Sequence, residues 1–120
     1  PVTPDTIGGY IQAIDPMTAK PKWKVPIMGQ LPGSAVLVTG GGLLFTGLHT
    51  GEVIAVDADN GEQLWKFKTP SGVNAQPVTW TRNGRQYVTI LSGSGGTTSQ
   101  RRGLPDIPLG GTLFTFALPE

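Results

Sequence analysis

Few side chains of this sequence have the types and spacing that catalysis needs. His49 is the only histidine and stands beside a turn, so we expect it at the surface rather than in acid–base work. No Ser-His-Asp set has geometric support in the sequence. Asp15 and Asp57 each begin a turn, where an Asx hydrogen bond to the backbone is a more ordinary role than metal binding. These residues therefore predict turns rather than a catalytic group.

A stretch rich in glycine, serine and threonine, residues 92–99, is the second candidate for ligand binding. It lacks the Gly-Lys-Ser/Thr ending with which a phosphate-binding loop holds a nucleotide. Arg101, Arg102 and Asp106 follow in the same long loop, where charged side chains are usually solvated. We therefore expect no nucleotide here.

The composition excludes several classes of protein. Nine Lys+Arg against eight Asp+Glu give a formal net charge of +1 with the basic residues scattered, so we expect no nucleic-acid partner. The chain has no cysteine, hence no disulfide or thiolate metal site of its own. No run approaches about 18 apolar residues, so no membrane span is expected. The apolar residues alternate over strand-length runs, which predicts an all-β fold despite 18 Gly and 11 Pro.

Two stretches of the chain repeat one strand–turn–strand pattern. An alanine, an aspartate and a tryptophan recur 42 residues later: Ala13, Asp15 and Trp23 match Ala55, Asp57 and Trp65. A period near forty, with about four short strands in each unit, is typical of β-propeller blades. The sequence therefore predicts a partial β-propeller of four-stranded antiparallel blades.

The predicted blades divide the chain into three parts. Residues 1–33 give the outer strands of one blade and a link, residues 34–70 a complete blade, and residues 71–120 an incomplete last blade with a long loop at 92–110. Strands are expected near residues 9–15, 20–25, 35–38, 43–47, 52–57, 62–68, 76–81, 85–91 and 111–117, with a turn-rich link at 26–33 and a tight hairpin at Asn83-Gly84.

The predicted blades are too few to close a ring. About two and a half blades would leave broad apolar faces in water, which monomers rarely tolerate. We therefore expect the chain to pack against the remaining propeller blades or other copies of itself. The last blade lacks its outer strand, which propellers often borrow from the other end of the polypeptide.

The repeated pattern Ala-x-Asp-x-x-Thr-Gly-x-x-x-Trp resembles the tryptophan-docking motif of the pyrroloquinoline quinone (PQQ) dependent alcohol dehydrogenases. In these eight-bladed quinoproteins each Trp packs between the Ala of its own motif and the Gly turn of the neighbouring blade. Asn60 stands where Thr is usual in the second copy, and Ala19 stands in the Gly slot of the first. The resemblance implies five blade-packing residues: Ala13, Trp23, Ala55, Gly61 and Trp65.

The resemblance covers nearly the whole chain. Residues 86–96 look like the family's penultimate hairpin and cofactor loop, and residues 110–119 look like its C-terminal strand. The resemblance thus implies the C-terminal part of such an enzyme. The family oxidises an alcohol by hydride transfer to PQQ, which lies beside a Ca²⁺ or lanthanide ion.

The resemblance also places two loops beside the cofactor. In the first, Pro32 or Gly33 stands where many members carry a Trp; in the second, Gly96 and Thr97 stand where relatives often have Gly-Trp. These four residues are the expected cofactor contacts, although both loops lack the aromatic surface that flanks a planar quinone. The family's metal ligands, catalytic Asp and vicinal Cys pair belong to earlier blades. No catalytic or metal-binding residue is therefore assigned here, and the isolated chain is expected to be inactive.

Two other functions remain open at this point. A non-catalytic propeller scaffold that binds protein partners, like the outer-membrane assembly lipoproteins, is favoured by the missing aromatic residues and disfavoured by the match of the terminal strand. Short chains that assemble into a ring are the third hypothesis. The resemblance to the enzymes further implies a periplasmic or otherwise exported protein.

Overall fold

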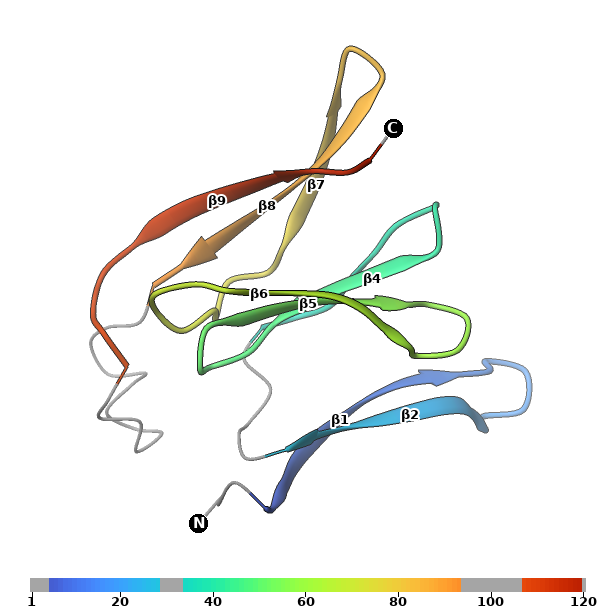
Figure 1. Cartoon of the computed structure of the whole chain (residues 1–120). Helices are drawn as coiled ribbons and strands as arrows, with labels where there is room; N and C mark the ends of the chain where they lie inside the picture. The colour runs from blue at the N-terminus through green and yellow to red at the C-terminus, as the bar shows by residue number, and fades with distance from the viewer. Residues whose placement is uncertain (1–4, 29–33, 94–106, 120) are drawn as a thin grey trace.

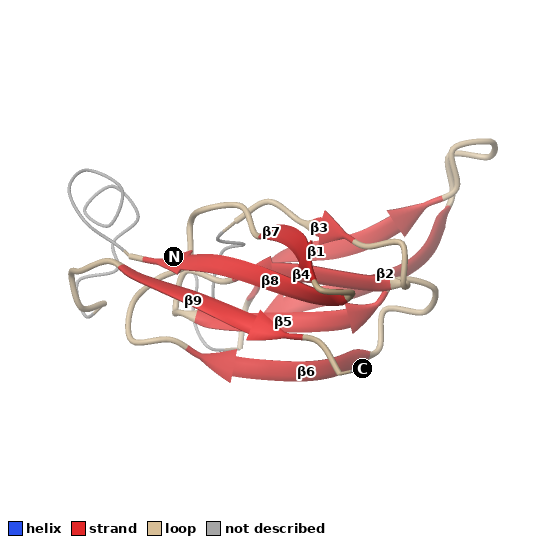
Figure 2. Cartoon of the chain, turned by 90° about the horizontal axis from the view of Figure 1, so that it is seen from above, coloured by secondary structure: helices blue, strands red, loops and turns tan. Residues whose placement is uncertain are grey.

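The fold consists of antiparallel sheets, as the sequence predicts. The computed structural model describes residues 5–28, 34–93 and 107–119, and within them it contains strands and no helix (Figures 1 and 2). The strands are β1 (Ile7–Ile14), β2 (Pro21–Met28), β3 (Leu37–Val38), β4 (Leu43–Gly47), β5 (Glu52–Asp57), β6 (Gln63–Lys68), β7 (Val78–Arg82), β8 (Arg85–Ser92) and β9 (Thr112–Ala117).

The strands form three sheets that stack on one another. The first sheet has the order β1-β2, the second β3-β4-β5-β6 and the third β7-β8-β9, and neighbouring strands in each are antiparallel. Figure 1 shows the first sheet at the bottom, the second in the middle and the third at the top. Stacked sheets joined in chain order are the arrangement of neighbouring propeller blades.

Several strand bounds differ from the sequence prediction, and the differences at β2, β3 and β8 are the clearest. β2 continues to Met28, so Pro26 and Ile27 pair with Tyr10 and Gly9 instead of beginning a link. Proline is tolerated there because β2 is an edge strand of its sheet, where an amide hydrogen is not required. β3 is only two residues long, and β8 extends to Ser92, which pairs with Thr112.

Strand β5 lies at the centre of the stack and is buried on both faces. Ile54 and Val56 point to the first sheet, where they join the apolar cluster of Ile11, Ile27, Leu44 and Leu48. Val53 and Ala55 point to the third sheet, where they join Phe45, Val73, Val88 and Ile90. Burying each of the larger side chains stabilises the fold by about 1.5–3 kcal/mol. The two interfaces between sheets are therefore the two cores of the chain.

The turns after β1 and β5 have the same hydrogen bonds, as the repeat requires. Asp15 Oδ1 accepts from Met17 N and Asp57 Oδ1 accepts from Asp59 N, each at 2.8 Å, which confirms the predicted Asx turns. The turns also share a left-handed residue, Ala19 with φ 57° and Gly61 with φ 79°. Glycine adopts this conformation without strain, whereas alanine does not.

Trp23 of β2 joins the first sheet to the turn that follows β5. A Cβ atom added to Gly61 would lie 2.7 Å from Cε3 and 2.9 Å from Cδ2 of this indole, so only glycine allows the contact. The indole Nε1 donates a hydrogen bond of 2.9 Å to Ala58 O in the same turn. On its own sheet Trp23 pairs with Ala13 across the strands. The indole thus fixes the spacing of the first and second sheets.

The hairpin between β7 and β8 has the predicted two-residue turn. Asn83 and Gly84 both have positive φ, 51° and 75°, and Arg82 pairs with Arg85. This is the geometry of the type I′ turn that Asn-Gly favours. Trp80 stacks on Tyr87 with ring centroids 4.5 Å apart, so it is a packing residue of the hairpin.

The Gly61→Ala substitution tests the docking contact. We expect a loss of about 2–4 kcal/mol in the free energy of unfolding, because the methyl group overlaps the indole and strains a left-handed residue. Ala19→Gly at the equivalent turn is the matched control, and it should stabilise by ~0.5–1 kcal/mol. Urea unfolding measures both. Equal, small changes in the free energy of unfolding at the two positions would show that the packing of Trp23 does not require a glycine at position 61.

Candidate functional site

The long connections of the chain gather at one end of the stacked sheets. Antiparallel strands in sequential order place alternate connections at opposite ends. Figure 1 shows the turns β1–β2, β3–β4 and β5–β6 to the right, the β7–β8 hairpin at the top, and the connections β4–β5 and β6–β7 to the left. We call the left side the loop end; its described residues are 34–36, 48–51, 69–77, 93 and 107–111. Loops carried on a rigid scaffold are where propellers and other β folds bind ligands.

A buried hydroxyl cluster lies at the loop end between the second and third sheets. Thr69 Oγ1 is 2.8 Å from both Gly51 O and Ser71 O, and Ser92 Oγ is 2.8 Å from Thr69 Oγ1 and 3.0 Å from Ser71 O. Each hydroxyl has one proton and so donates to one of these oxygens at a time. Thr69, Ser71 and Ser92 are all at most 4% exposed. The cluster therefore holds three chain segments together in a site closed to water.

Gly51 is the residue that lets this cluster close. Its φ is 99°, and an added Cβ would lie 2.5 Å from Ser71 O and 2.8 Å from Thr69 O. Its carbonyl also accepts from Thr69 N at 2.9 Å. The turn after β4 is thereby pressed against the segment that leaves β6.

Hydrogen bonds fix the described residues on either side of residues 94–106 to the segment between β6 and β7. Gly93 N donates to Gly72 O at 2.9 Å, and Ser71 Oγ donates to Pro108 O. An added Cβ at Gly93 would lie 2.5 Å from Gly110 O. Both ends of the intervening loop are therefore held close together. The Asn74 amide adds a long contact to Gly93 O, 3.5 Å from Nδ2.

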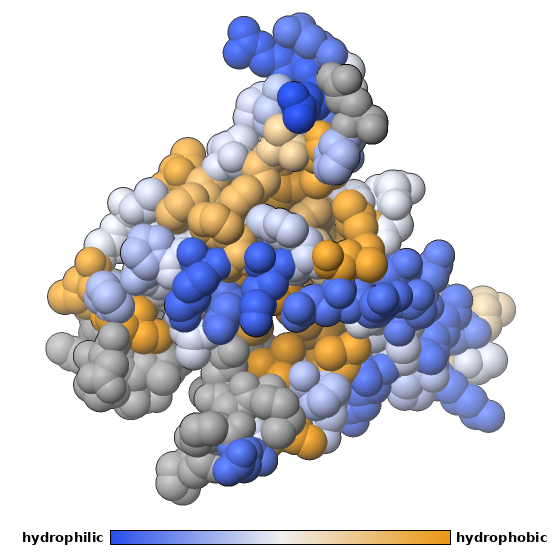
Figure 3. Space-filling view, viewed as in Figure 1, coloured by the Kyte–Doolittle hydropathy of each residue, from blue (hydrophilic) through white to orange (hydrophobic). Residues whose placement is uncertain are grey.

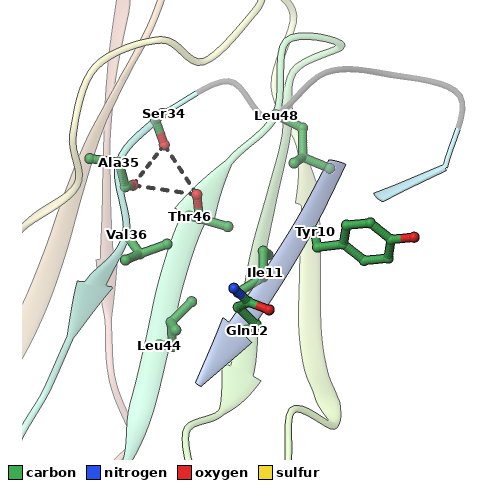
Figure 4. A pocket seen from close by; sticks show the side chains of 9 residues that line it. All are labelled: Tyr10, Ile11, Gln12, Ser34, Ala35, Val36, Leu44, Thr46 and Leu48. Atoms are coloured by element: carbon green, nitrogen blue, oxygen red, sulfur yellow. Dashed lines mark hydrogen bonds between the residues drawn. The ribbon is translucent and has the colours of Figure 1, made fainter. Parts of the chain in front are cut away.

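A cavity of about 320 Å³ opens between β1 and the β3–β4 pair. Figure 4 shows Ser34 and Thr46 turned toward Ala35, whose carbonyl oxygen accepts from both hydroxyls at 3.1 and 3.3 Å. Ser34 Oγ also accepts from Gly47 N at 2.8 Å. These hydroxyls are engaged with the backbone. The rest of the lining is Val36, Leu44 and Leu48 together with the edge of β1 at Tyr10, Ile11 and Gln12.

His49 is buried, and the prediction of a surface position is wrong. It is 2% exposed in the turn between β4 and β5. The turn is covered because Leu48 O accepts from Val73 N at 3.0 Å, which brings the segment after β6 over it. That contact joins residues 25 apart, and a local reading of the sequence gives no sign of it.

Two further findings limit the chemistry of the described residues. Within them, no three His, Cys, Asp or Glu side chains come together as a metal ion requires. They also contain no helix of the length and apolarity of a membrane span. The hydroxyls, glycines and carbonyls described above position the backbone of the loop end.

The sequence-predicted residues fall into two groups. The expected cofactor contacts Pro32, Gly33, Gly96 and Thr97 lie outside the described residues. The expected packing residues Ala13, Trp23, Ala55, Gly61 and Trp65 lie at the sheet interfaces. Ala13, Trp23 and Gly61 are brought together, as described above, whereas Trp65 pairs with Ala55 on its own sheet and meets Phe116 of the third sheet edge-on at 4.9 Å. Its indole is 36% exposed.

Sequence reasoning missed the hydroxyl cluster. Thr69 and Ser71 stand in a Thr-Pro-Ser-Gly run that signals only a turn, and Ser92 lies 21 residues further along the chain. The sequence did contain one signal for the cluster: the glycine at position 51, which stands where two chain segments approach closely.

The stacked antiparallel sheets and the 42-residue repeat define the chain as part of a β-propeller. The family model described as "PQQ: Glucose/ethanol/alcohol dehydrogenase, beta-propeller domain" matches residues 8–88. The chain belongs to this family of PQQ dehydrogenase propellers.

Individual relatives agree with the family. The quinoprotein alcohol dehydrogenase PedH of Pseudomonas putida is 41% identical over 125 residues, which cover 100% of this chain and 21% of that protein. The 1-butanol dehydrogenase (quinone) of Thauera butanivorans is 42% identical over 93% of this chain and 18% of that protein. The chain therefore spans about a fifth of the length of these curated relatives.

Solved structures show the same architecture. The quinohemoprotein alcohol dehydrogenase from Comamonas testosteroni superposes with a TM-score of 0.78 at 33% identity, covering 90% of this chain and 16% of that one. A europium-containing methanol dehydrogenase superposes with a TM-score of 0.76 at 30% identity, covering 89% and 23%.

The Thr69→Val substitution tests the hydroxyl cluster. Valine keeps the shape of threonine but leaves buried oxygens without their donor, so we expect the free energy of unfolding to fall by about 1–3 kcal/mol. The control is Thr81→Val on β7, where the threonine is exposed, and a change within ~0.5 kcal/mol is expected. Thermal or urea unfolding measures both. A neutral Thr69→Val would mean that the cluster does not hold the loop end.

Proposed function

We propose that this chain is the C-terminal part of a PQQ-dependent alcohol dehydrogenase, where it supplies two and a half blades of the propeller. The single observation that carries the proposal is the docking of Trp23 on Gly61, the contact that the resemblance implies between neighbouring blades. The names of the relatives support the reaction class, since they are quinone-dependent dehydrogenases of alcohols.

The cofactor of the complete enzyme is proposed to be PQQ with Ca²⁺ or a lanthanide. The europium-containing relative supports a metal partner for the quinone. The loop end fits such a ligand in one respect: the glycine at position 93 lets its backbone segment approach that of Gly110 closely. We propose direct contacts by Pro32, Gly33, Gly96 and Thr97. When bound, PQQ supplies the acceptor for the hydride that leaves the alcohol.

The role proposed for the described residues is to build and hold the wall of the site. The hydroxyl cluster and the Gly93–Gly72 bond fix where the loop that carries Gly96 and Thr97 leaves and rejoins the sheet. The apolar interfaces on both faces of β5 exclude water from the wall. The base and the metal ligands are proposed to come from other blades, so this chain by itself is inactive.

The surface supports the proposal that other blades cover the two ends of the stack. The outer face of the third sheet exposes large apolar side chains, Val78 (54%), Leu91 (46%) and Leu113 (66%) among them. Figure 3 shows apolar residues gathered over the third sheet, above a polar band at β6. We propose the remaining propeller blades as partners, with residues 1–33, 34–70 and 71–120 as the parts of three successive blades, and export to the periplasm by analogy with the relatives.

Titration of the complete polypeptide with PQQ tests this function. We expect saturable binding in the presence of Ca²⁺ or a lanthanide, followed by the absorbance of the quinone, and alcohol-dependent reduction of an artificial electron acceptor. This chain alone should show no turnover. A complete polypeptide that binds no PQQ under either metal would favour the non-catalytic propeller scaffold. A native protein of only 120 residues that forms a compact monomer would contradict the blade assignment.

A further inference from the structure

The repeat makes the outer face of the first sheet comparable, residue by residue, with a face that is already packed. Residues 10–14 of β1 and 21–26 of β2 have counterparts 42 positions later in β5 and β6. The second sheet packs on the first through Ile54 and Val56, which are 4% and 1% exposed. The counterparts of these two residues are Gln12 and Ile14, on the face of the first sheet that points away from the second.

The outer face of the first sheet is exposed in this chain, and its side chains differ from those of the packed face of the second sheet. Ile14 is 51% and Tyr10 47% exposed, and Gln12 is exposed as well. Lys24 lies on the same face, with Nζ 3.6 Å from the centroid of the Tyr10 ring. Figure 4 shows Tyr10 turned away from Leu44 and Thr46 of the second sheet. Gln12 therefore occupies a position that is core in the packed interface, although its side chain is an amide.

The turn beside this face also differs from its counterpart. Gly61 accepts an indole against its bare Cα, whereas Ala19, in the same left-handed conformation, carries a methyl group there. An indole in the position that Trp23 takes on Gly61 would overlap that methyl group, since Cβ contacts shorter than 3.0 Å are not formed. A partner that covers the outer face of the first sheet therefore cannot dock an indole on Ala19 as Trp23 docks on Gly61.

We infer that the outer face of the first sheet is a polar joint, whose partner is a preceding blade of the same repeat with a carboxylate opposite Gln12 and Lys24. The inference rests on the proposed function. It assumes that a further blade covers the outer face of the first sheet, as the second sheet covers its inner face. Covering buries the Gln12 amide, and a buried amide needs a hydrogen-bond partner.

A carboxylate is the partner that the charges of this face favour. Lys24 pairs with Gln12 across the two strands and so lies on the same face. Within the described residues Lys24 has no carboxylate at ion-pair distance, where Lys68 has Glu52 at 3.9 Å. One carboxylate accepts from both the amide and an ammonium group, and so serves the whole joint.

Substitutions at Gln12 in the complete polypeptide test the joint through hydrogen exchange of the β1 amides. Gln12→Ile should speed their exchange about tenfold, because it removes one of the two donors of the buried carboxylate. Gln12→Glu should speed it further, because it places two carboxylates together. Gln63→Ile on β6 is the control, an exposed strand glutamine whose replacement should leave β1 exchange unchanged.

The outcomes separate this inference from the proposed function. Slower exchange in Gln12→Ile would overturn the polar joint and show an apolar partner, while leaving the propeller in place. Unchanged exchange in both Gln12 variants, with wild-type β1 amides unprotected, would show that nothing covers this face; both the joint and the larger propeller would then be wrong. Protected wild-type β1 amides with no effect of either variant would overturn the joint alone.

Discussion

The contact between an indole and a glycine without a Cβ is the constraint on which the structure depends. Trp23 approaches Gly61 so closely that no other residue fits in the turn, and its Nε1 bond to Ala58 fixes the direction of approach. An apolar interface alone would let two sheets slide, because hydrophobic burial has no direction. The docked indole removes that freedom. The side chains of Ile54 and Val56 then meet Ile11 and Ile27 in one arrangement, and the turn ends of the sheets stay aligned.

The docked indole aligns the sheets at the turn after β5, and this alignment also fixes the strands where they enter the loop end. β5 is buried on both faces, so its neighbours cannot move independently of it. The connections 48–51 and 69–77 emerge from these fixed strands and are joined by backbone bonds and by the buried hydroxyl cluster. Buried hydrogen bonds have direction and a fixed length, so they fix the course of these connections. The apolar interfaces set the positions of the sheets, and the polar cluster sets the positions of the loops.

The sequence predicted what depends on local spacing and missed what depends on distant segments. The repeat of Ala, Asp and Trp gave the antiparallel sheets and the partners of the docking turn, and Asn83-Gly84 gave the hairpin, because each pattern acts within a few residues. His49 was misplaced because the segment that covers it comes 25 residues later. The cluster of Thr69, Ser71 and Ser92 was missed for the same reason. Trp65 shares its motif with Trp23 but meets Phe116 instead of a glycine, since the third sheet presents an aromatic strand there.

The separation between the two ends of the sheets has a consequence for how such a protein diversifies. Gly93 and Pro108, which border residues 94–106, are fixed at the loop end, whereas the docked indole lies at the turn after β5. An insertion in the turn after β5 would instead shift Gly61 out of step with its neighbour. Substitutions at the loop end can therefore accumulate while the turn after β5 keeps its glycine. The sequence of the connections can change in this way without any change in how the sheets pack.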